Sequence, residues 1–456
     1  MRQPDSAIAC LVLLAAVAAA CAALAKDGRA TTIALAICQT FSVIWLAALS
    51  WSRRRAWATV GVLVAAAWTA TFLVSSWIYV ISPGLLDVGS ATHALAVVEL
   101  SLVCLIGGMA LYPRRSSTAA PSYVQVIPTA LKPRIVAAWC VAGLLGLAVV
   151  LESGGGPLHY LKNLSNEGSL ERGKTYFVVL ALGLLFAAQA TACARWSCGR
   201  RLGSTQVFAV LIALGLVALL GARLFIAAAL VELGLCYALV RRRPRLRVLV
   251  PALVVGAALL IFGLGAVKRY SNYQGTHPGV HISFAHYLRT VAVSEMPTAY
   301  ANNYADGVRL IALGLIVVPS YAPPEYGKEL IRLALQAIPH SWRPNVATAP
   351  AIKAAFYPAG GYAYAQPLQL VSYLQLSFPG VVLAFFLLGA VIAELDRRLA
   401  RPRTLRLSTL LALLALAVDV PEFLRAASGT ADSVYAISLL LFWLVVRSSE
   451  RTTIAA

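Results

Sequence analysis

Apolar runs of about twenty residues recur along this chain, and they decide what it can fold into. A helix of about that length crosses the hydrocarbon core of a bilayer. The expected spans lie near residues 7–25, 31–51, 56–81, 92–112, 134–151, 175–195, 205–220, 223–240, 247–267, 370–393, 405–424 and 433–447. The chain is 60% hydrophobic and only 12% charged, which excludes the soluble classes. We therefore predict an all-α polytopic membrane protein with about twelve transmembrane helices.

The formal net charge of +20 follows the predicted topology rather than a nucleic-acid surface. Basic residues cluster in every second predicted loop, around Arg53, Arg115, Arg200, Arg243 and Arg401. In membrane proteins, Lys and Arg concentrate in cytoplasmic loops. The pattern predicts that these loops and both termini are cytoplasmic, and that the intervening loops face outward.

A long polar segment, residues 268–366, interrupts the series of spans and is predicted to be a large extracytoplasmic loop. No linker or convincing internal repeat separates modules, so we expect one membrane domain over residues 1–456. Within the loop, the apolar run Leu310–Val318 is too short to span and predicts a re-entrant or interfacial helix. Residues Glu325–Ile338 read as an amphipathic helix that ends at Pro339.

Two arginines at predicted outer helix ends are the first candidates for chemistry. Arg223 opens an apolar span after a short turn, and Arg425 closes the penultimate span. A guanidinium at this depth is costly unless it is paired or hydrated, and it can grip a phosphate through two hydrogen bonds. The structural alternatives are a snorkelling side chain and, for Arg425, a salt bridge to Asp419 or Glu422.

The outward segment supplies the remaining candidates. A histidine can serve as acid or base near neutral pH, and an arginine three residues away could hold a phosphate, which describes His340 and Arg343. Glu295 is a second candidate catalytic group. The candidate substrate-binding cations are Arg269, Arg289, Arg309, Arg343 and Lys353. A solvated loop is the structural alternative for His340 and Arg343.

Four features, in this order, resemble the Wzy-type O-antigen and exopolysaccharide repeat-unit polymerases. They are the turn Gly221-Ala222-Arg223, the Ile-Pro-x-x-Trp-x-Pro stretch Ile338–Pro344, Gly360-Gly361 leading to Phe378-Pro379-Gly380 and Phe385–Gly389, and Arg425. The resemblance covers most of the chain from about residue 150 onward. The chain departs from the family at His340, where a basic residue is frequent, at Lys353, which lacks an adjacent proline, and at Gln366–Gln369, where a glutamate is frequent.

The resemblance implies a GT-C-like membrane glycosyltransferase at the outer face of a bacterial cytoplasmic (inner) membrane. Such an enzyme moves a growing glycan from undecaprenyl diphosphate onto a lipid-linked repeat unit. It implies no metal and no cofactor, so arginine would stabilise the departing diphosphate while a base accepts the hydroxyl proton. The implied partners are undecaprenyl-diphosphate-linked oligosaccharide and the bilayer, with a chain-length regulator as a further candidate and no nucleic acid.

Two other functions fit the same residues. An O-antigen ligase uses the same donor with a lipid A core acceptor. A flippase or transporter of lipid-linked oligosaccharide should place ionisable residues deep within spans, along a translocation path. Only Glu99 and Glu232 stand near mid-span, which favours surface chemistry.

Overall fold

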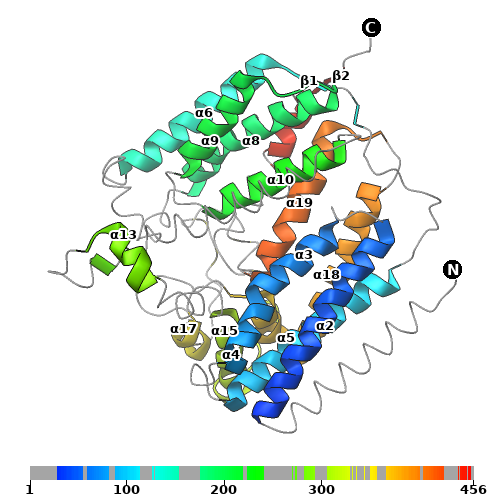
Figure 1. Ribbon diagram of the computed structural model, residues 1–456, viewed down its shortest axis with the longest axis vertical. Coiled ribbons are helices and arrows are strands. Elements are labelled where there is room, and N and C mark those ends of the chain that lie inside the picture. The colour runs from blue at the N-terminus through cyan, green and yellow to red at the C-terminus, as the bar shows by residue number, and fades with distance from the viewer. Residues whose placement is uncertain are drawn as a thin grey trace. The chain divides into compact units, whose positions relative to one another are not determined.

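Figure 1 shows a computed structural model of the chain. The structure describes residues 28–54, 59–81, 88–112, 126–127, 129–153, 175–218, 223–240, 270, 273–274, 282–292, 306–328, 331, 335, 342, 344, 350–356, 366–400, 404–425, 440, 442–448 and 450–452. These residues are almost entirely helical, which confirms the all-α class. They fall into two compact units: unit 1 takes residues 1–120, 297–400 and 419–433, and unit 2 takes the rest.

Seven helices among the described residues are long and apolar enough to cross a membrane, as expected of a polytopic membrane protein. They are Arg29–Ser50, Val60–Ile81, Ser90–Leu111, Pro133–Glu152, Val179–Ser197, Leu368–Leu399 and Leu407–Arg425. Shorter apolar helices are Ser204–Leu216, Ala228–Val240 and Gly307–Ser320. The predicted spans 7–25 and 247–267 lie outside the described residues, and 433–447 is described only in part. The number twelve therefore stays a prediction.

Unit 1 is a bundle of apolar helices, two of which are also connected by hydrogen bonds between polar side chains. Its elements are α2 (Arg29–Arg54), α3 (Val60–Trp68), η1 (Thr69–Leu73), α4 (Val74–Ile81), α5 (Val88–Leu111), α15 (Asp306–Ser320), α17 (Pro350–Phe356) and α18 (Leu368–Ala400). Helices α2 and α5 run parallel, because the residue numbers of their contacting side chains increase in the same direction along both helices. Thr32 lies 2.9 Å from Thr92 between hydroxyl oxygens, and Ser42 donates to Glu99 at 2.8 Å.

Helices α5 and α18 meet through glycines. A Cβ atom on Gly108 would lie 2.0 Å from the carbonyl oxygen of Phe386, and one on Gly389 would lie 2.1 Å from that of Leu105. Only hydrogen fits at such a distance, so the two backbones touch directly. Close approach through small residues is how helices associate where lipid removes the hydrophobic drive.

Several helix ends of unit 1 gather at one place. Asp396 of α18 accepts from the backbone N–H groups of Val60 at 2.7 Å and Gly61 at 3.4 Å, so it caps α3. Tyr112 donates to Glu394 at 2.6 Å, and this hydrogen bond raises the pKa of Tyr112. The first residues of α3 and the last residues of α5 and α18 therefore lie together. This fits consecutive helices that cross a membrane in opposite directions. The side of the membrane that they face stays a prediction.

Unit 2 combines helices with a small sheet. Its elements are β1 (Thr129–Leu131), α6 (Pro133–Ser153), α8 (Thr175–Ser197), α9 (Ser204–Ala218), α10 (Arg223–Val240), α13 (Phe284–Tyr287), η5 (Leu288–Ala292) and β2 (Glu450–Thr452). Helix α8 packs against α6, α9 and α10 (Figure 1). Strands β1 and β2 pair antiparallel, with Ala130 opposite Arg451. Helix α19 (Leu407–Arg425) has residues in both units.

The sheet of unit 2 gathers three distant parts of the chain. The backbone N–H of Ile127 donates to Leu405 at 2.9 Å, and that of Ser408 donates to the Glu450 carboxylate at 2.6 Å. Lys132 donates to the carbonyl of Ser448 at 3.2 Å. The segments before α6 and α19 and the segment 448–452 thus lie together, although no sequence pattern predicted a strand here.

Candidate functional site

Arg223 stands where its sequence context predicted, as the first residue of an apolar helix. Helix α9 ends at Ala218 and α10 begins at Arg223. The first N–H groups of a helix have no partner within it, and they carry its positive dipole end. A cation at that position is unfavourable by itself, whereas the same N–H groups attract an anion. The side chain of Arg223 lies outside what the structure describes.

Arg425 is the last residue of α19 and is half-buried. Both Arg425 and Asp419 have an interaction partner in the structure. A cation at a helix C-terminus is also favoured by the dipole. Both observations support a structural role for Arg425 at the end of α19.

The other predicted site residues divide between the two units. Arg289 lies exposed in η5 of unit 2, whereas Arg309 lies exposed in the first turn of α15 in unit 1. Lys353 lies in α17 of unit 1, with its backbone described and its side chain not. The remaining predicted residues, Arg269, Glu295, His340 and Arg343, lie outside the described residues.

Arg289 follows a compact aromatic cluster. Tyr287 is buried, with Tyr270 and Tyr273 at ring-centroid distances of 5.4 Å and 5.5 Å. Ser283 caps α13 by accepting from the N–H of His286 at 3.2 Å. Aromatic packing thus fixes the backbone just before η5, the element that carries Arg289.

The predicted short apolar helix within the long segment is confirmed as α15, Asp306–Ser320. It packs against α5, α17 and α18, and it buries Val308, Ile311 and Val318. Because α15 is too short to cross a bilayer alone, its apolar side chains are covered by neighbouring helices instead. Part of the predicted loop is therefore built into the bundle of unit 1.

The segment after α15 forms hydrogen bonds with α18 at a point where that helix is broken. Leu376 and Ser377 leave helical geometry, which frees carbonyl groups just before them. The N–H of Glu325 donates to Leu374 at 2.7 Å, and that of Tyr326 donates to Gln375 at 3.0 Å. The Gln375 side chain donates to the buried Glu325 carboxylate at 3.3 Å. The carbonyl groups freed by the break are thus paired with a segment about fifty residues away in sequence.

The prediction of a helix beginning at Glu325 is wrong. Tyr326 has a φ of 51° and Gly327 a φ of 89°, so this point is a turn. Helical pairing starts later, where the N–H of Ile331 donates to Gly327 at 3.1 Å. The amphipathic pattern could not show this, because the turn depends on the contact with α18. Most of residues 329–338 lie outside the described part of the chain.

The two mid-span glutamates each have a polar partner on a neighbouring helix. Ser42 of α2 donates to Glu99 of α5 at 2.8 Å. In unit 2, Gln189 of α8 donates to Glu232 of α10 at 2.8 Å and also to the carbonyl of Ala229 at 3.2 Å. These contacts tie helices together, which is the ordinary use of polar groups between membrane helices.

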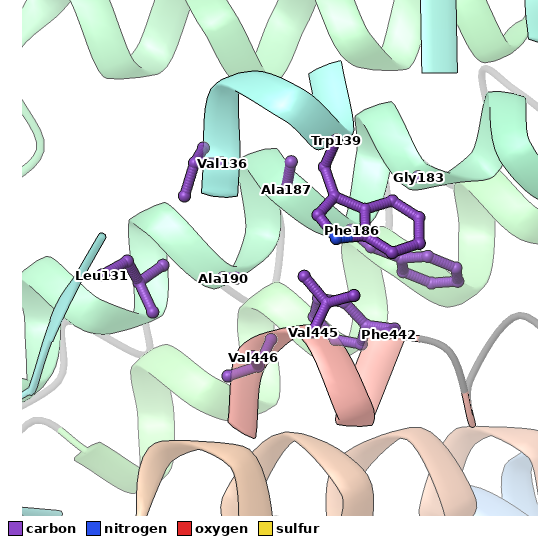
Figure 2. A pocket seen from close by; sticks show the side chains of 10 residues that line it. All are labelled: Leu131, Val136, Trp139, Gly183, Phe186, Ala187, Ala190, Phe442, Val445 and Val446. Carbon is purple, nitrogen blue, oxygen red and sulfur yellow. The ribbon is translucent and has the colours of Figure 1, made fainter. Parts of the chain in front are cut away.

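An apolar pocket lies between α6, α8, β1 and residues 442–446 in unit 2 (Figure 2). Its lining residues are Leu131, Val136, Trp139, Gly183, Phe186, Ala187, Ala190, Phe442, Val445 and Val446. Phe186 and Phe442 stack at a centroid distance of 4.7 Å. The pocket has an apolar lining and contains none of the predicted site residues.

Sequence reasoning missed the most unusual polar feature of unit 1. Gln366, just before α18, and Gln369, in its first turn, are fully buried, and neither amide has a hydrogen-bond partner among the residues that the structure describes. The only signal in the sequence was a pair of uncharged amides next to an apolar span. Comparison with protein-family models, curated proteins and solved structures found no match for this chain.

Proposed function

We propose that this protein is a glycosyltransferase that polymerises oligosaccharide repeat units. It acts on a glycan carried by undecaprenyl diphosphate and transfers it to a lipid-linked repeat unit at the outer face of the cytoplasmic membrane. The observation that carries the proposal is the position of Arg223 as the first residue of α10. The polymerase-like order of motifs around it supports the same reading.

The physical argument rests on the leaving group. When the glycosidic bond to the diphosphate breaks, negative charge builds up on the departing oxygen, and that charge must be stabilised. A helix N-terminus offers unpaired N–H groups, and a guanidinium adds a full positive charge with bidentate geometry. A diphosphate at the start of α10 would satisfy both, and it would compensate the unfavourable placement of a cation there.

Two other arginines, one in each unit, are suited to the same kind of ligand. Arg309 is exposed in the first turn of α15, and Arg289 is exposed in η5. Both are suited to bind an anionic lipid-linked substrate, which the apolar helices would hold by its polyprenyl chain. His340 and Glu295 remain the candidate bases for the acceptor hydroxyl.

An O-antigen ligase is the second candidate, because it needs the same stabilisation of a departing diphosphate. A flippase is less favoured. The two mid-span glutamates have partners on adjacent helices, a structural use, whereas a translocation path calls for several ionisable residues deep within the spans.

The decisive experiment is gel analysis of surface polysaccharide in a deletion strain with and without this chain. A polymerase predicts single repeat units in the deletion strain and a restored ladder on complementation. Free lipid-linked polymer that never reaches its acceptor would identify a ligase. Complete loss of surface glycan, with lipid-linked units trapped inside, would identify a flippase and contradict the proposal.

Arg223→Ala should lower polymer yield by about a hundredfold to a thousandfold, because it removes a donor to the transition state. Arg223→Lys should restore only part of the yield, since lysine cannot form the bidentate pair. The measurement is ladder density at equal membrane abundance of the protein. Arg201→Ala is the matched control, an exposed arginine in a predicted cytoplasmic loop. A normal ladder in Arg223→Ala would remove this residue from the mechanism.

A further inference from the structure

Two buried glutamines, Gln366 just before α18 and Gln369 in its first turn, lack hydrogen-bond partners within the described part of the chain. Each is 0% exposed, and neither the oxygen nor the nitrogen of either side chain is paired with a described residue. Buried polar groups in folded proteins are almost always hydrogen-bonded, and an unpaired one is strongly disfavoured. Two such exceptions so close together are what a binding site without its ligand would show, and a bound molecule would supply the missing partners.

Other buried glutamines of unit 1 are satisfied. Gln39 donates to the carbonyl of Leu95 at 3.2 Å and accepts from Ser76 at 2.6 Å. Gln375, on the same helix as Gln369, donates to Glu325 at 3.3 Å. Among the buried glutamines described in unit 1, Gln366 and Gln369 are therefore the two whose amides are unpaired. Trp45, Trp68 and Glu99 each leave a single side-chain atom unpaired, whereas both amides lack every partner.

The two amides are held on a rigid support. Leu370 lies so close to α15 that a Cβ atom on Gly314 would come within 2.3 Å of it. Tyr373 donates to the carbonyl of Val318 at 3.0 Å. Pro367, between the two glutamines, restricts the backbone. Neighbours on both sides thus lock this part of α18, which is how binding groups are held in a defined geometry.

The chemistry of the amides selects the ligand. Each primary amide offers two donors and an acceptor and carries no charge. Sugar hydroxyl and acetamido groups both donate and accept, so they complement such amides. A diphosphate would need cations in this enclosed place, because an uncompensated buried charge is far more costly than a buried hydroxyl.

We propose that Gln366 and Gln369 form a subsite that binds the hydroxyl or acetamido groups of a sugar ring in the glycan substrate. That the sugar belongs to a lipid-linked glycan rests on the proposed function, whereas the pairing of the amides with a neutral sugar does not. Both side chains are enclosed, so a sugar reaches them only after the surrounding chain shifts. They position the substrate and take no part in the bond-breaking step.

The first test compares stability without ligand. Gln366→Met and Gln369→Met keep the side-chain length and remove the unpaired amide. In the purified full-length protein, each should raise the melting temperature by about 2–4 °C. The control Gln39→Met should lower it, because that amide has two partners in the fold. A fall in both test variants that equals the control would show that the two amides are paired and would overturn the proposal.

The second test measures binding of an oligosaccharide released by mild acid from the surface polysaccharide of the host. It should bind the wild-type protein, and each methionine variant should weaken binding by about tenfold per lost hydrogen bond. Gln39→Met should bind it normally. No binding to the wild type, or equal binding by all variants, would overturn the sugar assignment.

The two proposals fail in different ways. A deletion strain with an intact polysaccharide ladder would contradict the polymerase, while the melting temperatures would still decide whether the amides are unpaired. If the intact chain restores the ladder but both methionine variants bind the oligosaccharide as tightly as the wild type, the polymerase proposal stands and the sugar subsite is contradicted.

Discussion

Helix α18 consists of two parts that differ in their contacts, separated by the break at Leu376 and Ser377. After the break, the helix is pressed against α5, with Gly389 and Gly108 allowing backbone contact. Before the break, it carries polar side chains, of which Gln375 is paired with Glu325 and Gln369 is not. One continuous apolar stretch in the sequence therefore has one half that packs against α5 through glycines and one half that combines apolar packing with polar contacts.

The difference shows how a membrane helix can acquire a polar site without losing its support. A regular helix uses its own carbonyls, so it has no free acceptors for another segment. The break releases the carbonyls of Leu374 and Gln375 to the turn at Glu325 and Tyr326. The half after the break keeps α18 in place against α5, while the half before it accepts hydrogen bonds from the turn.

The largest effect should come from filling the glycine contact. Gly389→Ala places a methyl group against the carbonyl oxygen of Leu105, and a backbone cannot give way as a flexible side chain can. We expect a loss of about 1–3 kcal/mol or more in unfolding free energy, measured as thermal unfolding in detergent. Gly215→Ala is the control, because nothing lies within 4 Å of the added atom. Equal stability of the two variants would contradict direct contact between α5 and α18.

A smaller effect should follow from cutting the polar contact before the break. Gln375→Met removes the donor to Glu325 and leaves a buried carboxylate less satisfied, which costs about 1–3 kcal/mol. Amide hydrogen exchange at Glu325 and Tyr326 should accelerate, because the turn is held less firmly. Gln369→Met, one turn and a half earlier, should change stability in the opposite direction. Two variants that shift stability in the same direction would remove the distinction between a paired and an unpaired amide.

The smallest effect should come from the break itself. Ser377 has a φ of 56° and a ψ of −147°, a region that glycine occupies far more readily than serine. Ser377→Gly should therefore stabilise the protein slightly, by about 1 kcal/mol at most, and Ser377→Val should destabilise it. Unfolding midpoints of the three proteins would rank them. A lower midpoint for Ser377→Gly would mean that the serine hydroxyl contributes more than the backbone strain costs.

Local signals in the sequence predicted much of the helical framework. The expected spans near 31–51, 92–112 and 134–151 match observed helices within a few residues. Apolar length reports directly on a helix that must satisfy its own backbone, so neighbouring residues suffice for this prediction. The start of α10 at Arg223 and the short helix α15 were predicted on the same basis.

The wrong or missing predictions share a different cause. The turn at Tyr326, the break in α18 and the pairing of β1 with β2 all depend on residues distant in sequence. The catalytic roles of Arg223, Arg425, His340 and Glu295 stay predictions, because they require a substrate geometry that residue pattern does not contain.

The sequence by itself determined that this is an all-α membrane protein with an arginine at the start of an apolar helix. Both properties follow from short-range hydrophobicity and from the length needed to cross a bilayer. Only the tertiary structure decided that Gln39 and Gln375 are paired while Gln366 and Gln369 find no partner in the described ranges of the chain. Whether a buried amide is satisfied depends on which distant backbone or side chain packs beside it, and no local pattern specifies that neighbour.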